Sequence, residues 1–208
     1  MLFTLFFASM LDNLGSFFLL FGNGAVIIPI IALGFICLDR KLFYQTACLL
    51  AFSMIMNVAL KISFQVPLPA ALGKGWYAFP SGHMQMATVF YGWLAYKIGI
   101  PWFRGVVVIL LLGISFSLIH FNYHNVYDIA GALFFALWIM VLYQFLLSRW
   151  PRNFPFILLI MAICLLCYID LIYGKIPLHA WLAFGVLLTL VVAKMVYSKK
   201  KNNEAINQ

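Results

Sequence analysis

Long apolar runs separated by short polar stretches make up almost the whole chain. A helix that crosses a bilayer needs about 20 apolar residues, and seven runs come close to this length or exceed it. The expected spans cover residues 14–38, 42–62, 84–98, 103–121, 127–147, 155–173 and 177–197. The pattern therefore predicts an all-α integral membrane helical bundle with six to seven transmembrane spans.

The two ends of the chain differ from this pattern. Residues 1–13 are apolar as far as Asp12 and Asn13, which allows either an interfacial helix or half of an additional span. At the other end, three consecutive lysines begin a polar segment, as expected of a tail held near anionic lipid. We expect one membrane-embedded domain over residues 1–198 and a basic, polar cytoplasmic tail over residues 199–208.

Composition supports a bilayer as the surrounding medium. The chain is 66% hydrophobic and only 9% charged, whereas a soluble domain has about a quarter charged residues. The net charge of +8 is not a nucleic-acid signal, because the cations are scattered between apolar runs. The expected partners are the bilayer and a substrate with a lipid tail, with no nucleic acid, and the pattern indicates no oligomeric state.

The lysines and arginines are unevenly divided between the two ends of the expected spans. One end holds ten of the thirteen, and the other holds Lys61, Lys74 and Lys175. Since positively charged loops stay in the cytoplasm, the second end faces outward. Polar stretches at residues 80–83 and 124–128 lie at this outward end. We expect a protein of the bacterial cytoplasmic membrane with an outward-facing site for an anion.

The first polar stretch, Pro80-Ser81-Gly82-His83, closes the one long connection between spans. Ser81 can cap a helix start, and Gly82 lets the backbone approach a ligand closely. The first N–H groups of the following span would face an anion at the positive end of the helix dipole. His83 then lies in the first turn, where it can donate a proton. The alternative is an ordinary capped helix with an interfacial histidine.

The second polar stretch runs from His124 to Asp128. A spacing of four places both side chains on one helix face if the segment is helical. A carboxylate on one imidazole nitrogen raises the basicity of the other, which suits a nucleophile toward phosphorus. For His120 a structural role is the simplest interpretation, with phosphate contact and metal ligation as alternatives. At the same outer end, a surface ion pair is expected, ahead of a lid contact, for Asp170, Lys175 and His179.

Taken together, these residues resemble the motifs of the type 2 phosphatidic acid phosphatase and vanadium haloperoxidase superfamily. Residues 80–83 match its Pro-Ser-Gly-His motif in full, and the resemblance covers residues 57–135. The positions that match its other two motifs are Lys61, Pro69, Ser117, His124, Asp128 and Gly131.

The resemblance implies an all-helical, phosphatase-like membrane domain and a role for each matched residue. His124 would attack phosphorus and carry a phosphohistidine, Asp128 would orient His124, and His83 would protonate the leaving group. The phosphate oxygens would be held by Lys61, Ser81 and the Gly82 amide. Phosphatases of this family need no metal, and no cofactor is expected.

Two positions depart from the family pattern, because Leu68 and Leu118 stand where it has arginine. Arginine binds phosphate through paired hydrogen bonds. Losing two such contacts costs about 3–6 kcal/mol, at about 1.5–3 kcal/mol each. A dianionic phosphate monoester loses most from this change, and a monoanionic diester loses less. Lys74 and His120 could restore positive charge for a monoester.

The expected function is cleavage or transfer of phosphate on a lipid phosphate or diphosphate at the outer leaflet, through phospho-His124. Three alternatives remain. One is a phospholipid head-group transferase of the sphingomyelin-synthase-like or inositol-phosphotransferase-like kind. The second is a catalytically inactive lipid-binding relative. The third is a metal-dependent hydrolase that uses His120, His124 and Asp128 and loses activity with a chelator.

Overall fold

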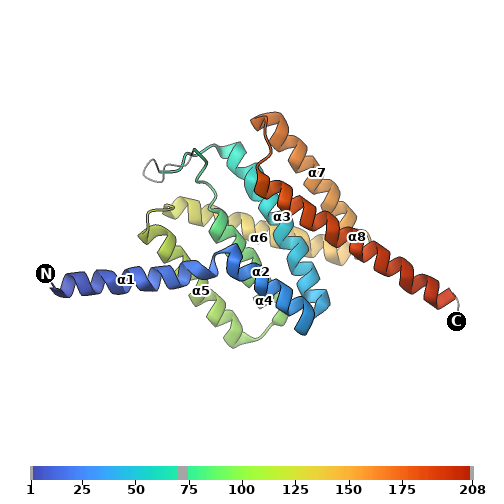
Figure 1. Ribbon diagram of the computed structural model, residues 1–208, viewed down its shortest axis with the longest axis horizontal. Helices are drawn as coiled ribbons and strands as arrows, with labels where there is room; N and C mark the ends of the chain where they lie inside the picture. Colours follow the sequence, from blue (N-terminus) through green and yellow to red (C-terminus); the bar gives the residue numbers. More distant parts are fainter. Residues whose placement is uncertain (1, 70–74, 207–208) are drawn as a thin grey trace.

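The structure is a computed structural model that describes residues 2–69 and 75–206. In these ranges the helices are α1 (Leu2–Phe21), α2 (Gly24–Cys37), α3 (Arg40–Phe64), α4 (Gly82–Ile98), α5 (Pro101–His120), α6 (Val126–Arg149), α7 (Phe154–Tyr173) and α8 (Leu178–Ile206). They pack side by side, and the ends of α1 and α8 project in opposite directions (Figure 1). No β-strand occurs in the described ranges, so the predicted all-α class is confirmed.

The number of helices that can cross a membrane overlaps the six to seven spans expected only at six. Among the described residues, five helices are long and apolar enough, and a bent pair makes a sixth if it counts as one span. The expected span at residues 84–98 corresponds to α4, which has only 17 residues. This short helix accounts for the difference from the seven runs seen in the sequence.

The expected single span at residues 14–38 is two helices. α1 ends at Phe21 and α2 begins at Gly24, with a bend of 44° between them. Asn23 explains the break, because its side chain accepts a hydrogen bond from the Ala25 N–H at 3.0 Å and so caps α2. Residues 2–13 all belong to α1. At the other end, α8 continues beyond the expected span and reaches Ile206.

The helices α3 and α4 form the centre of the bundle. α3 packs against α2, α4, α7 and α8, and α4 packs against α5 and α6 as well. The apolar segment of α3 is 67% buried, whereas those of α5, α7 and α8 are 22% buried. Because water is absent around a membrane bundle, polar groups are stable in it only where protein surrounds them. The centre is therefore the place where these helices can carry a polar site.

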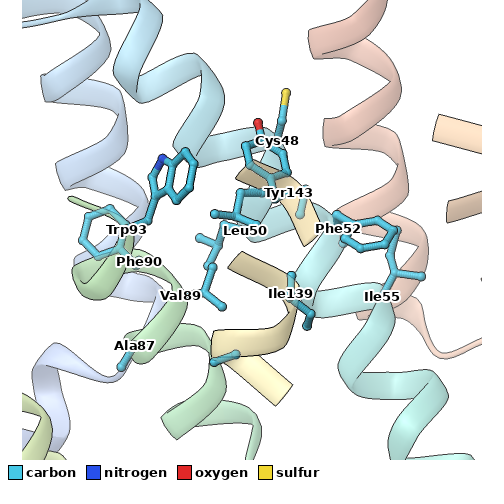
Figure 2. Packing of buried hydrophobic residues seen from close by; sticks show 14 of the residues in the cluster. Cys48, Leu50, Phe52, Ile55, Ala87, Val89, Phe90, Trp93, Ile139 and Tyr143 are labelled. Carbon is cyan, nitrogen blue, oxygen red and sulfur yellow. The ribbon is translucent and has the colours of Figure 1, made fainter. Parts of the chain in front are cut away.

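Small and aromatic side chains fill the space around this central pair. Figure 2 shows Phe90, Val89 and Trp93 of α4 beside residues of α3 and α6. Tyr143 on α6 is buried and donates a hydrogen bond to the Gln45 carbonyl at 2.9 Å. The buried alanines that allow close approach of these helices are Ala51, Ala59, Ala87, Ala95, Ala132 and Ala136.

Candidate active site

The connection from α3 to α4 folds back over the end of α3. Gln65 ends α3 in the left-handed conformation. The chain then returns, with the Leu68 N–H donating to the Trp76 carbonyl at 3.0 Å and the Ala78 N–H to the Val66 carbonyl at 2.7 Å. Residues 70–74 lie outside the described ranges, so the predicted site residue Lys74 lies outside them too.

Lys61 holds the second half of this connection, at Tyr77 and Ala78, against α3. Its Nζ donates to the Tyr77 carbonyl at 2.6 Å and to the Ala78 carbonyl at 3.0 Å. The side chain is buried, with 7% of its surface exposed. Two of the three N–H groups of this ammonium are therefore engaged by the protein, which leaves one for a ligand.

The start of α4 is joined to the start of α6. The Ser81 N–H donates to the Asp128 carbonyl at 3.1 Å. The Ser81 hydroxyl is the N-cap of α4, accepting from the Met84 N–H at 3.5 Å, and the residue is completely buried. Gly82 and His83 follow in the first turn, and His83 is exposed. The two predicted motifs thus meet in space, although they are about 40 residues apart in the chain.

His124 and Asp128 form the expected pair, but not on one face of a helix. α5 ends at His120 and α6 begins at Val126, so His124 precedes the helix and Asp128 lies in its first turn. Nδ1 of His124 is 3.2 Å from Oδ2 of Asp128. That oxygen also accepts from the Asn125 N–H at 3.1 Å, as part of a capping box. The helix cap therefore fixes the carboxylate that orients the imidazole.

The charge state of His124 follows from its surroundings. Burial lowers the pKa of His124 below its usual value. The hydrogen bond that His124 makes to the Asp128 carboxylate opposes this shift, and the nearby charges of Lys61 and His83 add to it. The imidazole is therefore neutral at pH 7. With Nδ1 turned toward Asp128, the lone pair of a neutral ring is on Nε2, which is the form that a nucleophile requires.

A cavity of about 890 Å³ lies against both motifs, a size typical of sites for small ligands. Its polar lining consists of Ser53, Asn57, Lys61, His83, Gln85, His124 and His179. Its apolar and aromatic lining consists of Met54, Leu68, Trp76, Tyr77, Met86 and Tyr123. The cavity brings together the two histidines that the sequence predicted as nucleophile and proton donor.

His120 lies apart from this cavity. Its Nε2 is 2.7 Å from Oδ1 of Asp12 on α1, and its ring stacks on Phe116 with centroids 5.4 Å apart. The i, i+4, i+8 pattern with His124 and Asp128 does not form one helix face, because α5 ends between them. In the described ranges, no three side chains of the types that ligate metals gather into a group. His120 is therefore not among the residues that line the cavity, where a phosphate contact was considered for it.

Leu68 and Leu118, which stand where the resemblance implies arginine, occupy two different environments. Leu68 lines the cavity, whereas Leu118 is completely buried in the core. Ser81 is held behind the cavity wall as a helix cap, so of its tetrapeptide only Gly82 and His83 reach the lining.

Four polar residues of the lining were not predicted as site residues: Ser53, Asn57, Gln85 and His179. Ser53, Asn57 and Lys61 follow one another at intervals of four, which is the signal that could have revealed a polar face on α3. His179 lines the cavity beside Trp76, with ring centroids 6.2 Å apart. The surface ion pair expected for His179 is not formed among the described residues.

Comparisons with family models, with curated proteins and with solved structures found no match for this chain.

Proposed function

We propose that this protein is a membrane enzyme that cleaves or transfers phosphate on a lipid phosphate ester or diphosphate, with His124 as the nucleophile. The observation that carries the proposal is the cavity that His83 and His124 line together, with Asp128 buried behind His124. A paired histidine and carboxylate facing a second histidine provides a nucleophile and a general acid in one site.

The reaction proceeds in two steps. Nε2 of His124 attacks phosphorus, the phosphorus–oxygen bond to the leaving alcohol breaks, and His83 gives that oxygen a proton. Water or a second alcohol then attacks the phosphohistidine and gives its proton to His83, which regenerates both histidines. The first turn of α4 and the remaining N–H of Lys61 stabilise the charge that develops on the phosphoryl oxygens.

The surroundings of the cavity favour a substrate with a lipid tail. The outer faces of the helices carry large exposed hydrophobic side chains such as Ile28, Leu112, Val141 and Leu171, which suit hydrocarbon. The uneven division of lysine and arginine favours an outward-facing cavity in the cytoplasmic membrane of a bacterium. A substrate in the outer leaflet would then reach the site by lateral diffusion.

Transfer of a phospholipid head group is the second candidate, and one observation favours it. Leu68 lines the cavity at a position where the resemblance implies an arginine. Lys61 donates two of its N–H groups to backbone carbonyls. The positive charge available to the phosphate is therefore small, which suits a monoanionic diester better than a dianionic monoester.

The test uses purified protein in detergent with a panel of lipid monophosphates, lipid diphosphates and head-group-labelled phosphodiesters. His124→Ala is the inactive variant, and His120→Ala is the matched control, because both histidines have an aspartate partner but only His124 lines the cavity. Free phosphate that depends on His124 supports hydrolysis, and labelled head group on a second lipid supports transfer. If the wild-type protein releases no more phosphate and transfers no more label than His124→Ala across the panel, the enzyme proposal is wrong.

A further inference from the structure

Three uncharged polar residues form a buried network beside the Pro80–Gly82 loop. Gln85 on α4 donates from Nε2 to the Ser53 carbonyl at 3.1 Å and to the Ser53 hydroxyl at 3.0 Å. Asn57 on α3 donates from Nδ2 to Oε1 of Gln85 at 2.9 Å and to the Pro80 carbonyl at 3.3 Å. All three residues are buried and all three line the cavity.

The hydrogen bonds determine which way each amide points. The carbonyl oxygens of Ser53 and Pro80 can only accept, so each must face an NH₂ group. Gln85 therefore directs its oxygen toward Asn57, and Asn57 must donate from its own NH₂ group. The Pro80 carbonyl at the other end of the network also requires the NH₂ group of Asn57, so both ends give the same orientation of the Asn57 amide. Both N–H groups of the Asn57 amide are thus used, and its oxygen Oδ1 is left over.

Oδ1 of Asn57 lies against Gly82, in the first turn of α4 that is proposed to face the phosphate. A Cβ added to Gly82 would be only 3.2 Å from it. Within the described ranges, no hydrogen bond to Oδ1 occurs, and the buried polar atoms without a partner are Tyr44 Oη and Trp93 Nε1. Because Oδ1 does not belong to that set and Asn57 lines the cavity, this acceptor is open to the cavity.

Ser53 has a hydrogen-bond donor to spare. On the same helix, Thr46 and Ser63 donate their hydroxyls back to the carbonyls of Leu42 and Ala59. Among the hydrogen bonds of the described residues, the Ser53 hydroxyl takes part only as acceptor from Gln85. One turn of α3 thus presents an acceptor at Asn57 and a donor at Ser53, which is the pattern that a hydroxyl group satisfies.

We propose that Asn57 and Ser53, held in place by Gln85, form a subsite for a hydroxyl-bearing alcohol esterified to the phosphate, such as a glycerol-type head group. The proposal rests on the proposed function for the position of the phosphate. A head group with a negative charge of its own would be repelled by Oδ1. No carboxylate lines the described part of the cavity, so a cationic head group would find no partner there. An uncharged polyol fits both conditions.

The test compares two lipids with identical acyl chains, phosphatidylglycerol and phosphatidyl-1-propanol, which differ only in two hydroxyls. Their dissociation constants are measured on full-length His124→Ala protein in detergent, so that the ligands stay intact. We expect phosphatidylglycerol to bind about 10-fold more tightly, because a site built for a hydroxyl rejects the analogue that lacks it. Adding Asn57→Leu should bring the ratio close to one, and adding Ser53→Ala should reduce it.

Thr88→Val in the same background is the control, because Thr88 is a buried polar residue of α4 outside the cavity lining. It should keep the 10-fold ratio. Ser53→Ala keeps the test decisive if Asn57→Leu fails to fold. Equal binding of the two lipids to His124→Ala, or an unchanged ratio in the Asn57 and Ser53 variants, overturns the subsite. Failure of the proposed function is a separate result, since it is seen as absent turnover in wild-type protein and leaves the binding ratio measurable.

Discussion

Two histidines of this protein that are four residues apart each pair with an aspartate, and only one of the two pairs lies at the cavity. His120 and Asp12 are 2.7 Å apart, with 25% and 61% of their side chains exposed. His124 and Asp128 are 3.2 Å apart, with 8% and 3% exposed. The pair with the longer distance, His124 and Asp128, is the buried one. A helix cap supports it, and it shares the cavity with a second histidine.

The difference shows that distance alone does not identify a catalytic pair. An exposed ion pair contributes about 0–1 kcal/mol because water and salt screen it. A buried pair acts in a low dielectric, where orientation and charge have much larger effects. The predictions below use His120 and Asp12 as internal controls for His124 and Asp128.

The largest effect is expected from removing the nucleophile. His124→Ala should lower turnover by at least about 1,000-fold, because it removes the imidazole nitrogen that Asp128 orients toward the cavity. His120→Ala should retain wild-type turnover within about 2-fold. Release of phosphate or transfer of label from a lipid substrate measures both variants. Equal losses in the two variants would contradict the distinction between the pairs.

Asp128→Asn should lower turnover by about 100-fold, the upper range for loss of a residue that orients a reactive histidine. Asn125→Ala is its control, because it weakens the same helix cap at a cost of about 1 kcal/mol without removing the carboxylate. Steady-state rates and thermal unfolding are compared for both. A rate loss in Asn125→Ala as large as in Asp128→Asn would mean that the cap, and not the carboxylate, is what matters.

Leu68→Arg should raise activity on a phosphate monoester relative to a diester by about 10-fold, since a charge-assisted hydrogen bond is worth about 1.5 kcal/mol or more. Leu68 lines the cavity, whereas an arginine at the buried Leu118 should destabilise the fold instead. The ratio of kcat/KM for the two substrates measures the effect. An unchanged ratio in folded Leu68→Arg would show that position 68 does not contact phosphate.

The pH profile should report the lowered pKa of His124. The nucleophile must be neutral, so activity is present above this pKa and lost as the pH falls through it. Because burial lowers the pKa, the acid limb of kcat/KM should lie below pH 6.5. The Asp128 hydrogen bond raises this pKa, so Asp128→Asn should move the limb lower still. A limb above pH 6.5, or one that moves with Asp12→Asn, would contradict the assignment.

The smallest effect is expected at the exposed pair. Asp12→Asn should change the free energy of unfolding by less than about 0.5 kcal/mol, because both partners are solvated. Reversible denaturation in mixed micelles measures it. A loss of 2 kcal/mol or more would mean that the link between α1 and α5 supports the bundle and that His120 is a poor control.

Much of this arrangement was accessible from the sequence, and the exceptions have physical reasons. The helical class followed from the apolar runs, and the meeting of His124 with Asp128 followed from their spacing. The break at Asn23 was missed because one capping residue hardly changes the hydropathy of a 25-residue run. The contact of His120 with Asp12 was missed because the two residues are 108 positions apart in the chain. Asn57 and Gln85 looked like isolated polar residues in the sequence, because the packing of α3 against α4 is what brings them within hydrogen-bond distance.

The central claim is that His124 carries the phosphoryl group, and direct trapping tests it best. Protein is mixed briefly with ³²P-labelled lipid substrate, denatured in alkali to preserve phosphohistidine, and digested for mass spectrometry. The account predicts acid-labile label on the peptide that contains His124, with none in His124→Ala and full labelling in His120→Ala. Turnover without trapped label at His124, or label on another residue, would contradict it.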